Sequence, residues 1–451
     1  MKTIKNMPQL DGSLGWYQTS SQRHTPIKTR TSSKKDYDYV IIGGGYTGLG
    51  VCSRLLQLEP EANIAIVDAL KIGEGTSGRN AGFIIDLPHN LDSDNADMTN
   101  ETMTFRLNSL AIELLYSHRK TYGIECNWQQ AGKYLAAHET KHIPALTVFT
   151  QAMDSLKADY EFIEKKALAE RLGTNYYQAA IYTPGNVLMN PAALIRGIAL
   201  GLSEQVDIFE NSPVTAIDYG KQGKPHTLIT HNKQAGNGPI NNQLSAKKLV
   251  FATNSFTEEF GLLNSRLAPV FTYASLSQVL NTDQQEQFNN VTPWGLTSAH
   301  RAGTTVRLTP DKRIFIRNGF NFNPDLTATQ NQIDKASIKH RQSFDRRFPQ
   351  LKGLPFEHTW GGMLCITGNH QPVFSATQNH VYTVAGMNGV GVAKGTYLGH
   401  YMAEYINGIS SENLDYILKT SKPNWIPPDP FRSMGVRTRL TVELAMAKGE
   451  V

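Results

Sequence analysis

The stretch that decides the fold is YDYVIIGGGYTGL, which covers residues 37–49. Its first six residues predict a short apolar strand, and the GxGxxG turn that follows opens a helix. Gly43 permits the tight turn, Gly45 lets the backbone approach a pyrophosphate, and Gly48 lets the helix pack closely on the strand. The pyrophosphate would meet the N–H groups of a helix N-terminus, which attract anions. This stretch therefore predicts a dinucleotide site.

A second strand supports this interpretation. The apolar run at residues 63–67 ends at Asp68, about 20 residues after the last glycine of the turn. An acidic side chain at this point accepts hydrogen bonds from ribose hydroxyls. A GxGxxG string alone, in a chain with 37 glycines, would also suit an ordinary loop. The strand, helix, strand and acidic end together complete a βαβ unit, which favours dinucleotide binding.

Length and composition suit an enzyme rather than a nucleic-acid-binding protein. The chain has 451 residues, 40% of them hydrophobic, which is enough for a large core and two or three domains. The net charge is +5 without a stripe of basic and aromatic residues, so we expect no nucleic-acid partner. Cys52, Cys126 and Cys365 form no CxxC pair, so we expect neither a disulfide framework nor a metal site.

The N-terminal 36 residues are polar and lack the apolar core of a signal peptide. Nowhere do about 20 apolar residues run together, so the sequence predicts no transmembrane segment. Together with the widely spaced cysteines, these features favour a cytoplasmic protein. A peripheral membrane contact stays open.

A loop rich in small residues follows the acidic strand end and reads GEGTSGRNAG at residues 73–82. Its backbone amides and the Ser77 hydroxyl could reach a phosphate or a flat ring, and Arg79 could add a positive charge beside an anionic cofactor. The alternative is a flexible surface loop. The position of the segment next to Asp68 favours a cofactor loop.

A second strand, glycine turn and helix occurs late in the chain. Residues 381–385 are β-prone, residues 386–391 read GMNGVG, and residues 392–406 have apolar side chains at helical spacing. The helix N-terminus would present amides and a positive dipole end to an electron-rich group. A plain strand-to-helix connection is the alternative.

These segments, in this order and spacing, resemble the D-amino acid oxidase-like FAD oxidoreductases. That family includes glycine and sarcosine oxidases and gamma-glutamylputrescine oxidoreductases, to which the GYTGL and TSGRN motifs and the N-terminal lead with Tyr17 are most similar. The resemblance covers most of the chain. It rests on VIIGGGYTGL at 40–49, ALKIGEGTSGRNAG at 69–82, MNPAAL at 189–194, SPVTAI at 212–217, LVFATN at 249–254, WGG at 360–362 and GMNGVG at 386–391.

The resemblance implies where FAD binds. The SGRNAG loop would line the flavin, Val214 would meet the adenine side, and the late glycine turn would face the isoalloxazine. The implied cofactor residues are Gly43, Gly45, Tyr46, Thr47, Gly48, Asp68, Ala69, Thr76, Ser77, Arg79, Asn80, Ala81, Gly82, Val214, Asn388, Gly389, Val390 and Gly391. Cys365 does not match the spacing of the cysteine that holds flavin covalently in sarcosine oxidases, so we expect non-covalent FAD.

The implied fold class is α/β, with a Rossmann-like FAD-binding domain interleaved with an α+β substrate domain built on a mostly antiparallel sheet. We expect an N-terminal extension at 1–36, the FAD domain at 37–100, 190–255 and 356–410, the substrate domain at 101–189 and 256–355, and a C-terminal tail with a short helix at 411–451. The patterns predict helices at 98–122, 140–158, 191–205, 327–347 and 436–448, strands at 131–137, 206–210, 214–218 and 247–253, further strands over 268–320, and a hairpin across 222–245 with a polar loop at 235–239.

Catalytic residues are less clearly indicated, because flavin carries the chemistry of amine oxidation and the protein mainly orients the substrate. Candidate polar groups near the flavin are Arg79, Tyr273, Arg317 and Lys394. Arg79 and Arg317 could bind a substrate carboxylate. Arg317 could instead belong to a solvated strand face, and Tyr273 could be a core residue. Lys394 is one position away from the lysine that some sarcosine-type oxidases carry after the glycine turn.

Two further features bear on the site. Where relatives often carry an aspartate, residues 367–372 read TGNHQP, with Asn369 in its place, so we expect a less anionic site. His89 and His370 are interpreted as structural or surface histidines, and Cys365 as a buried, inert thiol.

Three functions compete at this point. The first is an FAD oxidase of a small amine or amino acid, including polyamine derivatives, that returns electrons to oxygen as hydrogen peroxide. The second is a dehydrogenase of the same fold that passes electrons to a quinone or carrier protein. The third is an FAD-binding assembly factor without activity, which the intact turns disfavour.

Overall fold

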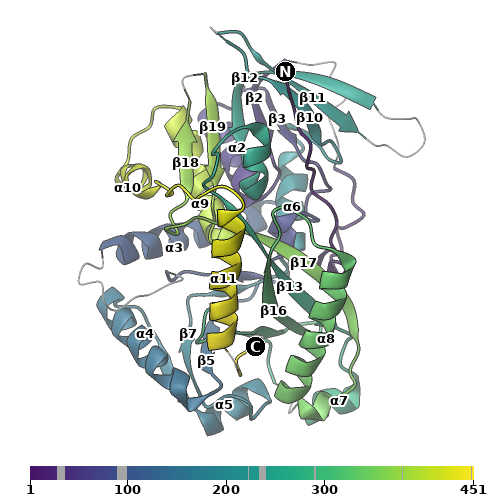
Figure 1. Cartoon of the computed structure of the whole chain (residues 1–451), viewed down its shortest axis with the longest axis vertical. Helices are drawn as coiled ribbons and strands as arrows, with labels where there is room; N and C mark the ends of the chain where they lie inside the picture. Colours follow the sequence, from purple (N-terminus) through teal and green to yellow (C-terminus); the bar gives the residue numbers. More distant parts are fainter. Residues whose placement is uncertain are drawn as a thin grey trace.

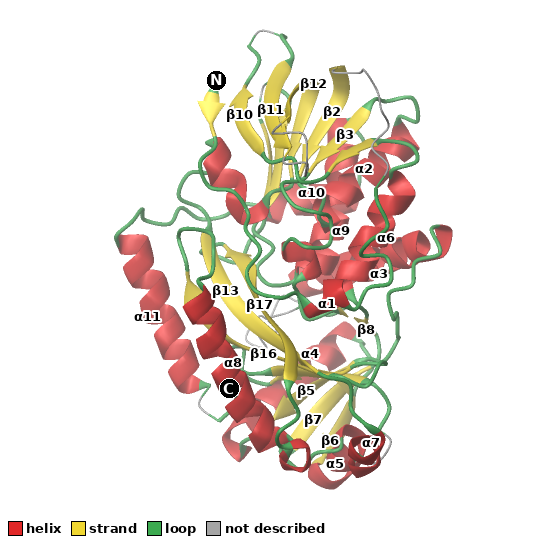
Figure 2. Ribbon diagram, turned by 90° about the vertical axis from the view of Figure 1, so that its right-hand side faces the viewer, coloured by secondary structure: helices red, strands yellow, loops and turns green. Residues whose placement is uncertain are grey.

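Two large β-sheets and the helices packed on them make up the computed structural model (Figure 1). It describes residues 1–27, 36–88, 99–221, 223–232, 240–288, 291–377, 379–447 and 449–451. Figure 2 shows one sheet in the upper half of the molecule and the other in the lower half. The chain crosses between the two halves several times, so neither half is continuous in sequence.

The nine-stranded sheet is built around β2 (Asp36–Ile42), the strand predicted before the glycine turn. Its parallel part contains β9 (Asp207–Phe209), β3 (Ile64–Val67), β2, β12 (Ile240–Phe251) and β19 (Val381–Ala385). Antiparallel strands extend it beyond β12 and β19: β11 (His226–Asn232), β10 (Val214–Asp218) and β1 (Lys2–Thr3) follow β12, and β18 (Val373–Ala376) pairs with β19. The central strands are buried on both faces, which explains their unbroken apolar runs.

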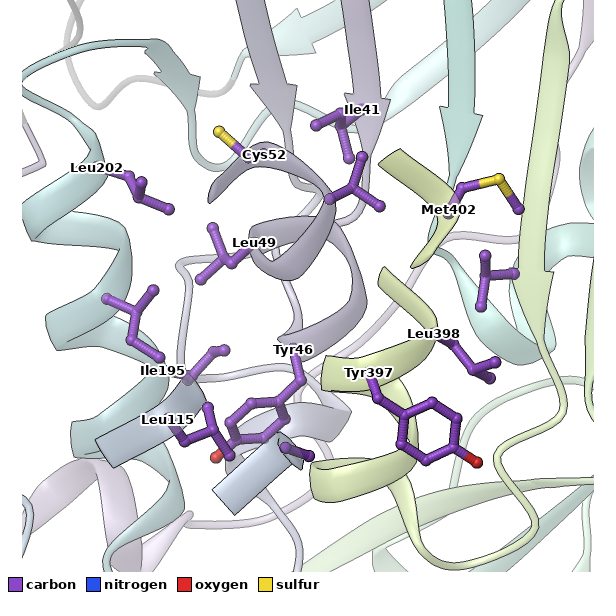
Figure 3. Packing of buried hydrophobic residues seen from close by; sticks show 14 of the residues in the cluster. Ile41, Tyr46, Leu49, Cys52, Leu115, Ile195, Leu202, Tyr397, Leu398 and Met402 are labelled. Atoms are coloured by element: carbon purple, nitrogen blue, oxygen red, sulfur yellow. The ribbon is translucent and has the colours of Figure 1, made fainter. Parts of the chain in front are cut away.

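Four helices cover one face of this sheet and form the largest hydrophobic core (Figure 3). They are α2 (Tyr46–Leu58), α3 (Thr99–Thr121), α6 (Pro191–Leu202) and α9 (Gly391–Ile406). Glycines allow α2 and α9 to pack very closely, because a Cβ atom on Gly399 would lie 2.3 Å from the carbonyl oxygen of Thr47. α6 begins at an N-cap, Asn190, whose side chain accepts a hydrogen bond from the Ala193 N–H.

The eight-stranded sheet is antiparallel except where β14 runs parallel to β5. Its order is β17 (Phe356–Ile366), β13 (Ala268–Ser277), β16 (Ile314–Phe322), β15 (Thr305–Leu308), β14 (Trp294–Ser298), β5 (Lys133–Ala137), β7 (Ala179–Thr183) and β6 (Glu161–Glu164). The helices around it are α4 (Ile143–Leu156), α5 (Lys165–Leu172), α7 (Thr282–Gln287), α8 (Gln330–Arg347) and α11 (Phe431–Met446), and the remaining short elements are α1 (Gly15–Gln18), β4 (Phe83–Ile84), β8 (Val187–Leu188) and α10 (Glu412–Thr420).

The predicted fold class is confirmed. The domain boundaries stay a prediction, and two elements pair with a different sheet or helix from the one that these boundaries imply. β17 was expected in the FAD domain but is an edge strand of the second sheet, and α3 was expected in the substrate domain but packs on α9. The C-terminal helix begins at Phe431 rather than at 436. The hairpin of β11 and β12 is confirmed, although its polar loop at 235–239 and His89 lie outside the described residues. No helix in the described part of the chain is long and apolar enough to cross a membrane.

We expect Gly399→Val to lower the free energy of unfolding by about 3 kcal/mol, because the new side chain would push α9 away from α2. Chemical denaturation measures this change. Gly435→Val in α11 is the matched control, since a Cβ atom there would meet no atom within 4 Å. Equal losses in the two variants would show that helix propensity, and not the contact of α9 with α2, causes the effect.

Candidate functional site

A cleft with about 1400 Å³ of empty space, part of it open to solvent, lies at the carboxyl ends of β2, β3 and β12. These strands are parallel, so their ends meet at one edge of the sheet, where ligands of this fold class bind. The loops that leave the three strands supply residues 43–47, 68–73 and 252–254 of the lining.

The first glycine turn has the geometry that the sequence predicted. Gly43 has a φ of +104°, which favours glycine, and a Cβ atom on Gly48 would lie 1.9 Å from the carbonyl oxygen of Gly43. A Cβ atom on Gly45 would lie 2.5 Å from the Ser77 hydroxyl, which accepts a hydrogen bond from the Tyr46 N–H at 3.3 Å. The 73–82 loop thus comes close to the turn, and both face the cleft.

Asp68 lines the cleft at the end of β3. Its carboxylate accepts hydrogen bonds from the N–H groups of Gly44 at 2.8 Å and Leu70 at 2.9 Å. Burial raises the pKa of Asp68 to about 6. Each carboxylate oxygen can accept a second hydrogen bond, so the predicted ribose contact is compatible with these two. That contact stays a prediction.

Buried donors from outside the segment hold the backbone of residues 79–82. Trp360 donates to the carbonyl oxygen of Arg79 at 3.1 Å, and Trp16 donates to that of Asn80 at 2.9 Å. Arg307 donates through Nη1 to the carbonyl oxygens of Ala81 at 2.7 Å, Gly82 at 3.2 Å and Met189 at 2.9 Å. These bonds fix residues 79–82 against the second sheet and leave Thr76, Ser77 and Asn80 on the cleft lining.

Arg79 belongs to this framework and not to the cleft. Its Nε donates to the carbonyl oxygen of Glu74 at 2.7 Å, and its Nη1 donates to those of Asp11 at 2.9 Å and Gly361 at 2.8 Å. It borders a smaller adjoining cavity and does not line the cleft. We therefore do not propose Arg79 as a ligand of a substrate carboxylate.

The late glycine turn is held by Asn388, which has a φ of +53°. Its side-chain oxygen accepts from the Thr367 N–H at 2.8 Å, and its amide donates to the carbonyl oxygens of Gly386 at 2.7 Å and His370 at 2.8 Å. Gly389 and Gly391 reach the cleft. Asn388 therefore holds the turn through these bonds and does not line the cleft, whereas the sequence predicted it among the cofactor contacts.

The structure separates the catalytic candidates Tyr273 and Arg317. Arg317 is paired with Ala274 in the sheet, so the neighbouring Tyr273 points to the opposite face. Tyr273 packs under α8 against Ile333 and is 2% exposed. We therefore do not propose a catalytic role for Tyr273.

Arg317 lies on the face that turns toward residues 79–82, although it is not among the residues that line the cleft or the smaller adjoining cavity. Ala274 of this face packs with Trp16 and Trp360, whose indole groups bind that segment. Arg317 is partly buried, its guanidinium lies 5.1 Å from the ring centre of Phe320, and burial lowers its pKa to about 10. Among the described residues, no carboxylate pairs with it.

Lys394 lies in the first turn of α9, directly after the late glycine turn. It is partly buried, and burial lowers its pKa to about 8. No ion pair of its ammonium occurs within the part of the chain that the structure describes. Its place at a helix N-terminus further disfavours the positive charge.

The cleft lining combines predicted and unpredicted residues. Of the implied cofactor residues, the structure brings together Gly43, Gly45, Tyr46, Thr47, Asp68, Ala69, Thr76, Ser77, Asn80, Val214, Gly389 and Gly391, and it leaves Gly48, Arg79, Ala81, Gly82, Asn388 and Val390 outside. Residues that sequence reasoning missed include Ile4, Asn6, Met7, Pro8, Thr253, Asn254 and Met363. The strand-end rule that found Asp68 would also have found Thr253 and Asn254, whereas no sequence signal marks residues 4–8.

Cys365 lines the cleft, but its thiol is buried and burial raises its pKa to about 12. A thiol is a poor nucleophile until it is deprotonated, so these surroundings support the expected non-covalent cofactor. Asn369, which replaces an expected aspartate, binds the C-terminal segment through the carbonyl oxygen of Lys422 at 2.9 Å. No group of three or more metal-binding side chains occurs among the described residues.

Comparisons with known proteins agree with this geometry. A family model described as FAD dependent oxidoreductase (DAO) matches residues 38–405. The chain is 23% identical over 439 residues to gamma-glutamylputrescine oxidoreductase of Escherichia coli K12, covering 93% of this chain and 96% of that protein. Its fold is similar to that of glycine oxidase from Bacillus cereus, with a TM-score of 0.65, 19% identity and coverage of 84% and 98%. L-proline dehydrogenase from P. horikoshii gives a TM-score of 0.66 at 17% identity, with coverage of 87% and 100%.

We expect Arg307→Met to lower the free energy of unfolding by about 2–4 kcal/mol, because buried carbonyl groups lose a charged donor. Thermal and chemical unfolding measure this loss. Arg437→Met on the exposed face of α11 is the control, and its effect should stay within about 0.5 kcal/mol. An unchanged stability of Arg307→Met would show that water replaces the guanidinium at these carbonyl groups.

We expect Lys394→Met to stabilise the flavin-free protein at pH 7. The pKa of Lys394 is lowered from 10.5 to about 8, so the unfolded chain holds the proton more tightly and the charged amine destabilises the fold below pH 8. The gain in Tm should shrink as the pH rises from about 8 to about 10.5. Lys339→Met, at an exposed position of α8, should show no such trend. A pH-independent gain would contradict the buried charge.

Proposed function

Since this chain belongs to the FAD-dependent oxidoreductase family, FAD is its cofactor, and we propose that it oxidises the carbon–nitrogen bond of a small amine or amino acid that carries a carboxylate. The bound flavin would accept two electrons from the substrate, and the resulting imine would be hydrolysed to a carbonyl compound and an amine. The protein's own part is to bind, orient and desolvate the substrate.

The cleft residues fit FAD. The glycine turn has no side chain where Ser77 approaches Gly45, and the Asp68 carboxylate keeps acceptor capacity toward a ribose. The cleft extends from Val214 of β10 to the late glycine turn, which allows an extended dinucleotide. We propose that these segments hold the cofactor, with residues 76–80 between its two ends.

The class of substrate is inferred from the guanidinium of Arg317. A partly buried guanidinium without an anionic partner is costly, because burial removes water from the charge. A substrate carboxylate would supply that partner in a bidentate geometry. The relative named gamma-glutamylputrescine oxidoreductase supports a polyamine derivative with a carboxylate as one member of this class.

The electron acceptor belongs to the same proposal. We propose oxygen, reduced to hydrogen peroxide, because the Lys394 cation beside the late glycine turn would stabilise negative charge formed when oxygen is reduced. A solved protein of similar fold is named an oxidase and another a dehydrogenase, so the fold itself does not decide the acceptor. Anaerobic reduction by substrate, followed by the rate of reoxidation in air and with a quinone, distinguishes the two.

We expect Arg317→Met to raise the KM for carboxylate-bearing amines by roughly 10–100-fold, the effect of losing a charge-assisted hydrogen bond. The corresponding carboxamides should react equally well with both proteins. The panel should contain glycine, sarcosine, proline and gamma-glutamylputrescine together with a set of hydroxy acids, and bleaching of the flavin absorbance is the readout. Arg437→Met serves as the control. An equal effect on acids and amides would remove the carboxylate assignment, and a panel in which only hydroxy acids bleach the flavin would remove the amine assignment.

A further inference from the structure

The N-terminal segment that precedes the family match contains a short arch, residues 5–10, between two anchored ends. At one end β1 pairs with β10, and the Ile4 N–H donates to the carbonyl oxygen of Thr215 at 2.9 Å. At the other end the carbonyl oxygen of Asp11 accepts from the Gly361 N–H at 3.0 Å. The arch therefore runs from the first sheet to the second sheet.

One side of the arch faces the cofactor cleft. Asn6, Met7 and Pro8 share its lining with Asp68 and Val214. Pro8, Gln9 and Asp11 border the smaller cavity beside Arg79. The arch thus covers the cleft from the Val214 side to the 73–82 loop.

The arch is weakly held between its ends. Among the described residues, its hydrogen bonds run from Asn6 to Glu259, at 2.9 Å from the side-chain amide and 3.4 Å from the backbone N–H. Leu10 is 54% exposed and lines neither cavity. A segment with few hydrogen bonds and little buried area opens locally at low free-energy cost.

We infer that the arch is a cofactor-binding wall of this chain, which closes over the adenosine diphosphate half of FAD and sets the rate of its release. Val214 and Asp68, which the arch faces, are the residues proposed to meet adenine and ribose. The inference rests on the FAD site of the proposed function. It adds a ligand-binding segment from outside the region that the family model matches.

Met7→Ala and Leu10→Ala test this inference as a matched pair on one arch. We expect Met7→Ala to speed FAD release roughly tenfold, which is equivalent to about 1.4 kcal/mol. Flavin fluorescence measures the rate of release. The affinity of the flavin-free protein for ADP, measured by titration calorimetry, should fall by a similar factor, while riboflavin binding stays the same. Leu10→Ala should stay within about twofold of wild type in each measurement.

Glu259→Ala tests the hydrogen bonds that hold the arch without changing the cleft, because the Glu259 side chain binds Asn6 of the arch but does not line the cleft. It should speed FAD release without changing the absorbance spectrum of the bound flavin. Combined with Met7→Ala, its effect should be less than additive, since both act on one segment. FAD release and ADP affinity equal to wild type in Met7→Ala would overturn the inference while leaving the proposed function intact. A purified protein without flavin that also fails to bind added FAD would instead overturn the proposed site.

Discussion

A buried guanidinium joins the two halves of this protein. Arg307 lies on β15 of the second sheet, is 1% exposed, and donates to the backbone of residues 81, 82 and 189. Burial lowers its pKa to about 9, because the surrounding protein removes water from the charged guanidinium. The carbonyl groups compensate, and the Trp16 ring lies 5.1 Å away in cation–π contact. The place of the 73–82 loop at the cleft depends on this arrangement.

The second sheet has two different faces as a result. One face carries Arg307, Phe315 and Arg317 and turns toward the segment that Arg307 binds. The other face carries Tyr273 and is covered by α8. Polar residues of this one sheet therefore have separate roles according to the face on which their side chains lie. Arg317 on the first face is the proposed partner of a substrate carboxylate, whereas Tyr273 on the second face belongs to the core.

Hydrogen bonds to residues far away in the sequence also fix both terminal segments. Trp16 inserts from the N-terminal segment beneath residues 79–82, and the Glu450 carboxylate accepts from the His138 N–H at 2.6 Å and from Ser298 at 2.9 Å. Neither segment has a strong pattern of its own. Their positions come from donors and acceptors that distant strands present, so sequence neighbours could not reveal them.

The sequence alone determined the parts of the site that depend on local geometry. The turn at Gly43, the acidic end of β3 and the late glycine turn require particular residues at particular steps, and these can be counted along the chain. Which face of a strand turns toward the cofactor depends on strand pairing instead. Arg79 was a predicted ligand but supports the backbone, Tyr273 is a core residue, and Ile4 and residues 6–8 line the cleft. Only the tertiary structure decided these outcomes. The local sequence permits several conformations equally well, and strand partners and buried carbonyl groups far away in the sequence select one of them.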